Sequence, residues 1–279
     1  MIKLENVTFY YDNQDRPAVR DLSLDIAEGA FVGVIGAGGS GKTSLTYLLN
    51  GIIPHHHPGE FYGRVLLDGM DTVETSLTDI SRVVGSVFED ISGQMVSSTV
   101  EDELLFGLVN FGYPRDEVTR RMLGTLADVG ISDLLYRDLE SLSGGQLQKV
   151  AIAATLALSP KVLVLDEPTG ELDPLSSERV YELLRDINRT KGTTIIVVEK
   201  KLELLCSYVD RVIAIDEGRV ALDGPVRRIL GDGAALRGLG LKSPAISELY
   251  EALSGQGLYA GEPPLTVAEA ERMVREAVA

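Results

Sequence analysis

A glycine-rich segment joins a short apolar run to a helical pattern near the start of the chain. Phe31 to Ile35 is typical of a buried strand, and Lys42 to Leu49 has apolar residues at helical spacing. Between them, Gly36 to Thr43 reads Gly-Ala-Gly-Gly-Ser-Gly-Lys-Thr. Glycines allow consecutive backbone amides to face one point, and a helix N-terminus adds partial positive charge there. The sequence therefore predicts an anion-binding turn between a strand and a helix, and with it an α/β fold.

The segment fits the P-loop pattern, in which backbone amides hold the phosphates of a nucleotide. In this pattern Lys42 reaches the β- and γ-phosphates, and the hydroxyl of Thr43 is a ligand of Mg²⁺. We therefore expect this part of the chain to bind ATP and Mg²⁺. The residues expected to contact the nucleotide here are Gly36, Gly38, Gly39, Ser40, Gly41, Lys42, Thr43 and Ser44.

A second apolar run ends in two carboxylates. Val162 to Leu165 is wholly aliphatic, which is typical of a strand buried on both faces of a parallel sheet. Asp166 and Glu167 then lie at the carboxyl end of that strand, where open α/β sheets bind ligands. Asp166 is placed to hold Mg²⁺, and Glu167 to orient or deprotonate an attacking water. The pair supports the nucleotide site predicted from the P-loop.

A third segment, Leu142 to Gln146, reads Leu-Ser-Gly-Gly-Gln. Ser143 is a favourable helix N-cap, and Gly144 and Gly145 expose backbone amides at the helix start. The P-loop, this segment and the acidic strand end follow one another in an order that resembles the ATP-binding cassette (ABC) ATPases. The resemblance extends from Met1 to about Leu230.

The resemblance implies a P-loop NTPase fold, with a mixed sheet as its core and a helical subdomain that carries the signature loop. It implies that this loop contacts the γ-phosphate of a nucleotide held by a second ATPase subunit. The signature residues expected to make this contact are Ser143, Gly144, Gly145 and Gln146. Tyr11 resembles the aromatic residue that stacks on adenine, and Gly170 to Asp173 resembles the loop that communicates between the two subunits.

Two positions depart from the family pattern. The segment Val84 to Glu89 ends in Glu where the family usually has Gln, a residue that senses Mg²⁺ and the attacking water. Glu89 only accepts hydrogen bonds when ionised, whereas an amide also donates. It could still be a ligand of Mg²⁺, and it adds negative charge near Asp166 and Glu167.

The second departure follows the predicted strand Thr194 to Val198. The family has a switch histidine there, which holds the γ-phosphate and the catalytic Glu, and the alignment places Lys200 at this position. The only histidines of the chain are His55, His56 and His57, so none replaces it. A lysine pairs with phosphate as a point charge but is not a neutral donor and acceptor. Losing one transition-state contact costs about 3–4 kcal/mol, or roughly 10²–10³ in rate.

These departures lead to the hypothesis that the catalytic residues Glu167, Lys200 and Glu89 form a slow or degenerate site on this P-loop. The signature loop is intact and is expected to complete a competent site on a related but different ATPase, in an asymmetric heterodimer. The alternative is a homodimer in which Lys200 keeps enough of the contact for ordinary turnover.

The composition limits the partners. The net charge of −16 disfavours nucleic acid as a partner and direct attraction to anionic lipid. No apolar run is long enough to cross a bilayer and no signal-like segment is present, so we expect no direct membrane insertion. The single cysteine, Cys206, is typical of a reducing cytosol. A role at a membrane then requires integral membrane proteins that hold the chain peripherally at the cytoplasmic face.

We assign residues 1–230 to the ATPase domain and residues 231–279 to a linker and a small helical tail. Gly231 to Gly240 is glycine-rich and is expected to be the linker. Helices are predicted from Ser243 to Leu253 and after Thr266, which is a favourable N-cap. The tail is expected either to serve dimerisation or to pack against its own domain.

Short segments resemble one class within the family, the ATPases of energy-coupling factor (ECF) transporters. They are Leu49 to Pro54, Ser98 to Glu103, and the run Val198-Glu199 with Lys201-Leu202-Glu203. The class implies a membrane module of a coupling protein and a substrate-capturing protein that imports vitamins or Co²⁺/Ni²⁺. Glu89 to Glu103 would be its docking surface.

Two other functions compete with this one. The first is the ATPase of a conventional ABC importer or exporter, which would have one permease pair. The second is an ABC-type ATPase of translation or DNA repair, which the single cassette, the lack of long coiled coils and the negative charge disfavour. The sequence does not identify the cargo, because such ATPases contact their membrane partners and not the substrate.

Overall fold

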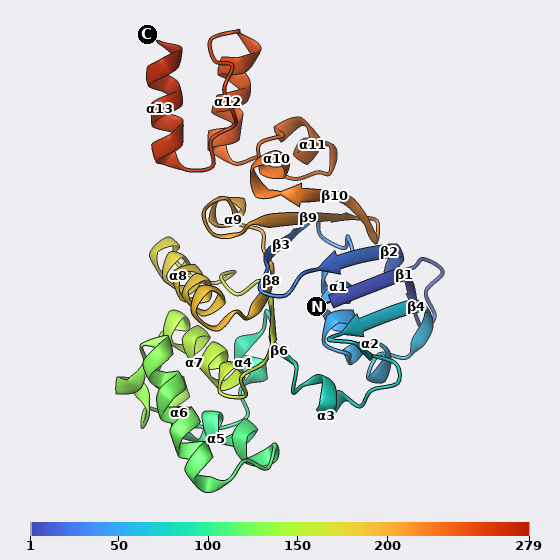
Figure 1. Cartoon of the computed structure of the whole chain (residues 1–279), viewed down its shortest axis with the longest axis vertical. Coiled ribbons are helices and arrows are strands. Elements are labelled where there is room, and N and C mark those ends of the chain that lie inside the picture. Colours follow the sequence, from blue (N-terminus) through green and yellow to red (C-terminus); the bar gives the residue numbers. More distant parts are fainter. Residues whose placement is uncertain (1, 279) are drawn as a thin grey trace.

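The computed structural model of the protein describes residues 2–278. Its strands are β1 (Ile2–Tyr11), β2 (Val19–Ile26), β3 (Phe31–Ile35), β4 (Gly59–Leu67), β5 (Met70–Asp71), β6 (Val84–Val87), β7 (Val162–Asp166), β8 (Thr194–Val198), β9 (Arg211–Asp216) and β10 (Arg219–Pro225). They form a six-stranded sheet in the order β10-β9-β3-β8-β7-β6 and a four-stranded sheet in the order β2-β1-β4-β5 (Figure 1).

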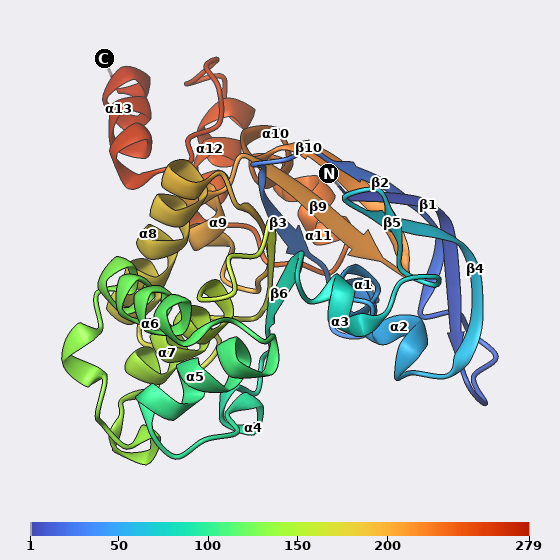
Figure 2. The ribbon, with the colours of Figure 1, turned by 60° about the horizontal axis from the view of Figure 1, so that its bottom comes forward.

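The helices cover both faces of the six-stranded sheet. They are α1 (Lys42–Leu49), α2 (Ile52–His55), α3 (Leu77–Ile80), α4 (Ile91–Gln94), α5 (Val100–Asn110), α6 (Arg115–Val129), α7 (Gly144–Leu156), α8 (Pro174–Lys191), α9 (Leu202–Tyr208), α10 (Val226–Leu230), α11 (Gly233–Gly238), α12 (Ala245–Gly255) and α13 (Val267–Ala277). Short 3-10 turns lie at Ser132–Leu134 and Leu139–Ser141. Figure 2 shows α5 to α8 gathered on one side of the large sheet, and β1, β2 and β4 on the other.

The six-stranded sheet is mixed. Strands β9, β3, β8, β7 and β6 run parallel, and β10 pairs antiparallel with β9 at one edge. Every residue of β3, β7 and β8 is buried, as mainly apolar strands in the middle of a two-sided sheet should be. The strands predicted at residues 31–35, 162–165 and 194–198 are therefore confirmed, and so is the expected mixed α/β core.

Helix α1 lies between the two sheets. Leu45 and Leu48 are buried in one cluster with Leu4 and Val65 of the antiparallel sheet and with Val34 of β3. Because α1 begins directly after the glycine-rich loop, this packing fixes the loop against the end of β3. The predicted helix 42–49 has the bounds expected from the sequence.

The signature loop begins helix α7 within a group of helices on the opposite face. Ser143 caps α7 by accepting a hydrogen bond from the Gln146 amide, and Gln146 Oε1 accepts one from the Ser143 amide, which completes a capping box. Val150 and Leu156 of α7 share a core with Leu104 of α5. The predicted N-cap and the helical signature subdomain are confirmed.

The C-terminal tail is helical, as expected, and the segment expected to be the linker contains a helix. Residues 233–238 form α11, because Asp232 caps that helix and Leu236 is fully buried in the main core. Helices α12 and α13 follow, and Thr266 caps α13 as predicted. Arg227 of α10 pairs with Glu269 of α13 at 2.9 Å, so the tail contacts the preceding domain. The division at residue 230 stays a prediction.

Two further expectations from the sequence concern the single cysteine and membrane-spanning segments. Cys206 is buried, and burial raises the pKa of its thiol to about 12, which makes it a packing residue. Within residues 2–278, no helix is both long and apolar enough to cross a membrane.

Candidate functional site

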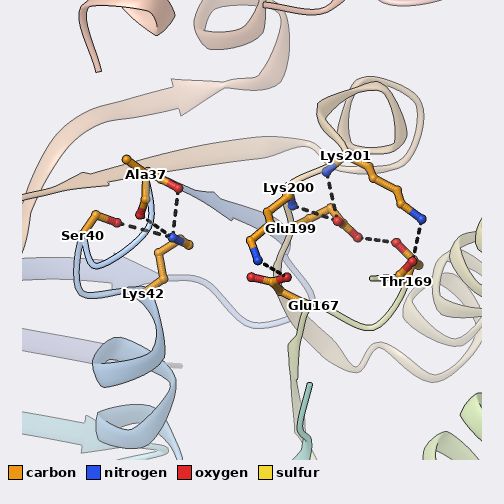
Figure 3. A network of polar contacts seen from close by, with 9 residues as sticks. Ala37, Ser40, Lys42, Glu167, Thr169, Glu199, Lys200 and Lys201 are labelled. Carbon is orange, nitrogen blue, oxygen red and sulfur yellow. Dashed lines mark hydrogen bonds and ion pairs between the residues drawn. The ribbon is translucent and has the colours of Figure 1, made fainter. Parts of the chain in front are cut away.

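The predicted site residues gather at one edge of the six-stranded sheet. Strands β3, β8, β7 and β6 are parallel neighbours, so the segments that follow them meet at their carboxyl ends. Gly36 follows β3, Glu199 follows β8, and Asp166 ends β7. Figure 3 shows Lys42 on one side of this edge and the Glu167–Lys200 pair on the other.

The loop of residues 36–41 requires glycine at its two ends. Gly41 has a φ of 106°, and a Cβ there would lie 2.5 Å from the carbonyl oxygen of Ala18. A Cβ on Gly36 would lie 2.3 Å from the carbonyl oxygen of Ile215. A side chain at Gly38 or Gly39 would meet nothing within 4 Å, so the middle of the loop is open. This open backbone cradle at the N-terminus of α1 fits the phosphates of ATP.

Lys42 extends back across the loop. Its Nζ donates to the carbonyl oxygens of Gly36 at 2.9 Å and Ala37 at 2.8 Å, and lies 3.5 Å from Ser40 Oγ (Figure 3). Burial lowers the pKa of Lys42, and the charges of Glu167 and Asp166 oppose that shift. An anionic phosphate would give this desolvated ammonium a direct counter-ion.

A cavity of about 750 Å³ extends outward from the P-loop. Tyr11, Lys42, Thr43 and Ser44 are among its lining residues, and the Tyr11 hydroxyl lies 3.1 Å from Ser44 Oγ. Tyr11 also makes an edge contact with His57 at a centroid distance of 5.6 Å. The cavity adjoins the cradle, as an adenosine site must, and Tyr11 as its stacking residue stays a prediction.

The residues expected to hold Mg²⁺ lie together. Asp166 is buried, and its Oδ2 accepts a hydrogen bond from Thr46 Oγ1 at 3.4 Å. Burial raises the pKa of Asp166, the charges of Glu167 and Glu89 raise it further, and the hydroxyls of Thr43 and Thr46 oppose the shift. Oxygen donors crowded with negative charge fit a divalent cation, and Mg²⁺ usually takes one or two carboxylates plus phosphate oxygens and water. Thr43 and Asp166 would be its protein ligands.

Because of this raised pKa, Asp166→Asn is expected to stabilise the metal-free protein at pH 7.5. The native state binds the proton more tightly than the unfolded chain, so stability falls as pH rises from the pKa of the unfolded chain through the raised pKa of the native state. We expect a Tm increase in EDTA on the order of 2–4 °C, the shift that about 1 kcal/mol gives in a domain of this size. Thermal unfolding measures this, with Asp186→Asn as the control because Asp186 is an exposed carboxylate of α8. A Tm of Asp166→Asn equal to or below that of the unchanged chain would contradict the account.

Glu167 and Lys200 form an ion pair. Lys200 Nζ lies 2.6 Å from Glu167 Oε2, and the Glu167 side chain is only 11% exposed against 63% for Lys200. Glu167 has a φ of 50° and donates its amide to the carbonyl of Val198, so its backbone turns tightly back on β8. The hydrogen bond to Glu167 is the main cause that raises the pKa of Lys200. Lys200 is therefore charged at neutral pH and occupies one oxygen of the expected base.

Glu89 lies on an exposed turn that faces the same space. It lines a cavity of about 620 Å³ together with Glu167, Lys200 and Gly144. Gln94, close by in sequence, has a different role: its Oε1 accepts from the Phe88 amide and its Nε2 donates to the Ser86 carbonyl. Gln94 thus holds the backbone before Glu89, and a direct role of Glu89 on Mg²⁺ stays a prediction.

The signature loop does not line the P-loop cavity of its own chain. Ser143, Gly145 and Gln146 line a separate cavity of about 200 Å³ with Lys149 and Ser176, whereas Gly144 faces the space beside Glu167. Among the described residues, the signature loop therefore lies outside the P-loop cavity of its own chain. This arrangement is compatible with a site completed by a second subunit.

The sequence reasoning missed three residues behind the catalytic pair. Glu199 is buried and bonded to Thr169, and Lys201 donates to the loop that follows β7. The signal in the sequence was the charged residues Glu199 and Lys201 soon after the mainly apolar strand β8. Their partners, Thr169 among them, are known only from the fold.

Comparison with known proteins decides the family. The ABC transporter family model matches residues 19–170, which is more than half of the chain. A putative ABC transporter ATP-binding protein of Pyrococcus horikoshii, PH1815, is 40% identical over 258 residues, covering 92% of this chain and 91% of the relative. The chain belongs to the ABC transporter ATP-binding proteins.

Solved structures agree with this assignment. CbiO1 of Clostridium perfringens, part of the CbiONQ ABC transporter complex, has a TM-score of 0.76 and 32% identity, covering 90% of this chain and 98% of CbiO1. The ABC transporter cassette MJ0796, solved as a dimer with ADP and Pi after hydrolysis, has a TM-score of 0.69 and 28% identity, covering 81% of this chain and 99% of that one. This ABC ATPase therefore binds and hydrolyses ATP to energise transport.

The buried lysine of the P-loop gives a direct test of nucleotide binding. Lys42→Ala is expected to weaken ATP binding by roughly 10–150-fold, since a hydrogen bond to a charged group contributes about 1.5–3 kcal/mol. Calorimetric titration with ATP measures this, with Lys161→Ala as a matched control because Lys161 is exposed and pairs with Asp68. An unchanged Kd for Lys42→Ala would place the phosphates elsewhere.

Proposed function

We propose that this chain is one of two related ATPase subunits of an ECF-type importer for a vitamin or a transition-metal ion. It would act as a peripheral subunit at the cytoplasmic face, held there by integral membrane proteins. The likeness to CbiO1, which covers 90% of this chain, is the observation that carries this proposal. The segments that resemble ECF ATPases in the sequence, such as Ser98 to Glu103, point the same way.

The proposed cycle is a two-subunit clamp driven by ATP. The P-loop and Lys42 bind the phosphates, and the signature loop of the opposite subunit closes over them. Bound Mg²⁺ would neutralise phosphate charge beside Thr43 and Asp166. Glu167 would orient and deprotonate the attacking water. Loss of the γ-phosphate removes the contact that holds the clamp closed.

We further propose that hydrolysis at this chain's own P-loop is slow. The ammonium of Lys200 pairs with Glu167 at 2.6 Å, so one oxygen of the base already has a partner. An ion-paired carboxylate is a weaker proton acceptor, because transfer of a proton to it would break the pair. The intact signature loop would complete the faster site, whose P-loop belongs to the other ATPase.

A groove beside Glu89 is the proposed docking surface for the membrane partner. It has a volume of about 440 Å³ and lies between β6 and the helical subdomain, lined by Phe88, Met95, Val96 and Phe106 among others. Val96 and Phe106 are 60% and 51% exposed and line this one groove, and apolar side chains gathered at one place on the surface are typical of protein interaction sites. Motion of the Glu89 turn would then pass between this groove and the catalytic residues.

Purification from detergent-solubilised native membranes through a tag on this chain, followed by mass spectrometry, tests the proposal. We expect a second, different ATPase together with small integral membrane proteins, which would also name the cargo candidates. Recovery of this chain alone with a large permease would instead support a conventional ABC transporter.

A further inference from the structure

The catalytic residues considered so far leave one buried carboxylate unexplained. Glu199 is 2% exposed and accepts four hydrogen bonds. Its Oε1 accepts the amides of Lys200 at 2.8 Å and Lys201 at 3.0 Å. Its Oε2 accepts the hydroxyls of Thr169 at 2.6 Å and Tyr181 at 3.3 Å. The carboxylate therefore joins the backbone after β8 to residues that follow β7.

Core packing alone does not account for this carboxylate. Removing a carboxylate from water is costly, and well-packed apolar side chains can often replace buried charges without loss of stability. All four donors to Glu199 come from the segments around the Glu167–Lys200 pair or from the helix behind it. Two of them are the amides of Lys200 and Lys201, which flank the Cα atom of Lys200. The carboxylate therefore fixes the direction in which the Lys200 side chain leaves the backbone.

A second set of hydrogen bonds joins the loop after β7 to the loop after β8. Lys201 Nζ donates to the carbonyl of Thr169 at 2.6 Å (Figure 3). It also donates to the carbonyl of Leu172 at 2.9 Å and lies 3.1 Å from Ser177 Oγ at the start of α8. Thr169 thus contacts Glu199 through its hydroxyl and Lys201 through its carbonyl. The loop after β7 and the loop after β8 are held as one unit, with the Glu167–Lys200 pair at its exposed end.

We propose that Glu199 is a positioning residue for ATP hydrolysis, which fixes the backbone at position 200 so that its side chain meets Glu167 and the γ-phosphate. The inference rests on the proposed role of position 200. Because Glu199 contacts no residue of the P-loop, its loss should lower kcat and leave the KM for ATP unchanged.

Three substitutions in two backgrounds test this, with kcat and KM for ATP as the readouts. Glu199→Leu removes the acceptor at similar size, and it is made in a Lys200→His and in a Lys200→Ala background. Glu199→Gln keeps an oxygen for the two amides and serves as the rescue. Asn188→Leu is the control, since Asn188 is also buried and donates to the carbonyls of Gly29 and Thr193, both at 2.8 Å, at the far end of α8.

In the Lys200→His background, Glu199→Leu is expected to lower kcat by roughly 10–100-fold, since small misplacements of a catalytic group have effects of that size. In the Lys200→Ala background it should change kcat by less than about twofold, because no side chain is left to position. Glu199→Gln should restore most of the loss, and Asn188→Leu should lower Tm with little change in kcat. If Glu199→Leu does not fold, Glu199→Asp, which withdraws the oxygens by one methylene, replaces it.

The two ways of failing are distinct. Equal losses of kcat in both backgrounds would show that Glu199 acts through general stability, and the inference would be wrong while the role of position 200 stands. Equal kcat values for Lys200→His and Lys200→Ala would show that position 200 contributes nothing, which overturns both the proposed role of Lys200 and the inference.

Discussion

Lys200→His is expected to raise the kcat of ATP hydrolysis by about 10²-fold, the lower end of what one transition-state contact contributes. Lys200 now pairs with Glu167 at 2.6 Å as a point charge. A neutral imidazole would contact the γ-phosphate and Glu167 without neutralising the carboxylate. The rate should be measured on the purified chain alone, where every complete site combines this P-loop with this signature loop.

Lys161→His is the control. It introduces the same side chain at an exposed lysine that precedes β7 and pairs with Asp68, at the opposite end of the strand from Glu167. We expect no change in rate from it. An unchanged kcat for Lys200→His would contradict the slow-site hypothesis and favour a homodimer with ordinary turnover.

Glu167→Gln is expected to remove the gained activity, with kcat falling by about 10²–10⁴-fold, the usual contribution of a general base. The change is made in the Lys200→His background so that the loss is measured from a high rate. Glutamine keeps the size and one acceptor oxygen but cannot take a proton from water. The Kd for ATP should be unchanged within about threefold, because we expect Lys42 and the loop amides to bind the phosphates.

Glu178→Gln provides the comparison for this second variant. Glu178 is an exposed carboxylate on α8, so its loss should leave turnover unchanged. A Glu167→Gln variant that keeps its kcat would mean that another group activates the water, and Glu89, which lines the same cavity, is the candidate.

Local sequence was sufficient to predict the P-loop and the acidic strand end. Gly41 to Leu49 contains both the left-handed turn and the helix that follows it, so the neighbours in sequence are also the neighbours in space. Val162 to Asp166 is buried on both faces, and its composition shows this without any knowledge of the fold. The family resemblance supplied the order of the elements.

The contacts behind the site could not be predicted in this way. Glu199 and Thr169 are 30 residues apart and meet only because β7 and β8 are adjacent parallel strands. The sequence shows a buried strand followed by charges, and the pairing of those charges depends on the strand order of the sheet. The 2.6 Å pair between Lys200 and Glu167 has the same origin.

The helix within residues 231–240 was not predicted, for a different reason. The glycines of this segment suggested a linker, but the segment also contains Ala234, Ala235 and Leu236, which favour a helix. The Asp232 side chain accepts a hydrogen bond from the Ala235 amide, and Leu236 is fully buried. Tertiary packing of one leucine and one cap thus outweighed the glycine content.

The asymmetry of the two sites is most directly tested in the complex purified from native membranes through a tag on this chain. Two variants are compared there: Glu167→Gln, which affects hydrolysis on this P-loop, and Ser143→Arg, which blocks the signature loop that serves the other P-loop. Ser76→Arg is the control, because Ser76 is likewise the N-cap of a helix. It caps α3 by accepting a hydrogen bond from the Asp79 amide.

We predict that Glu167→Gln lowers the ATPase rate of the complex by less than about twofold, whereas Ser143→Arg lowers it by more than about tenfold. Ser76→Arg should cost only the stability of a lost cap, about 1 kcal/mol. Equal losses from Glu167→Gln and Ser143→Arg would contradict the account, since they would mean that both sites of the complex hydrolyse ATP at the same rate.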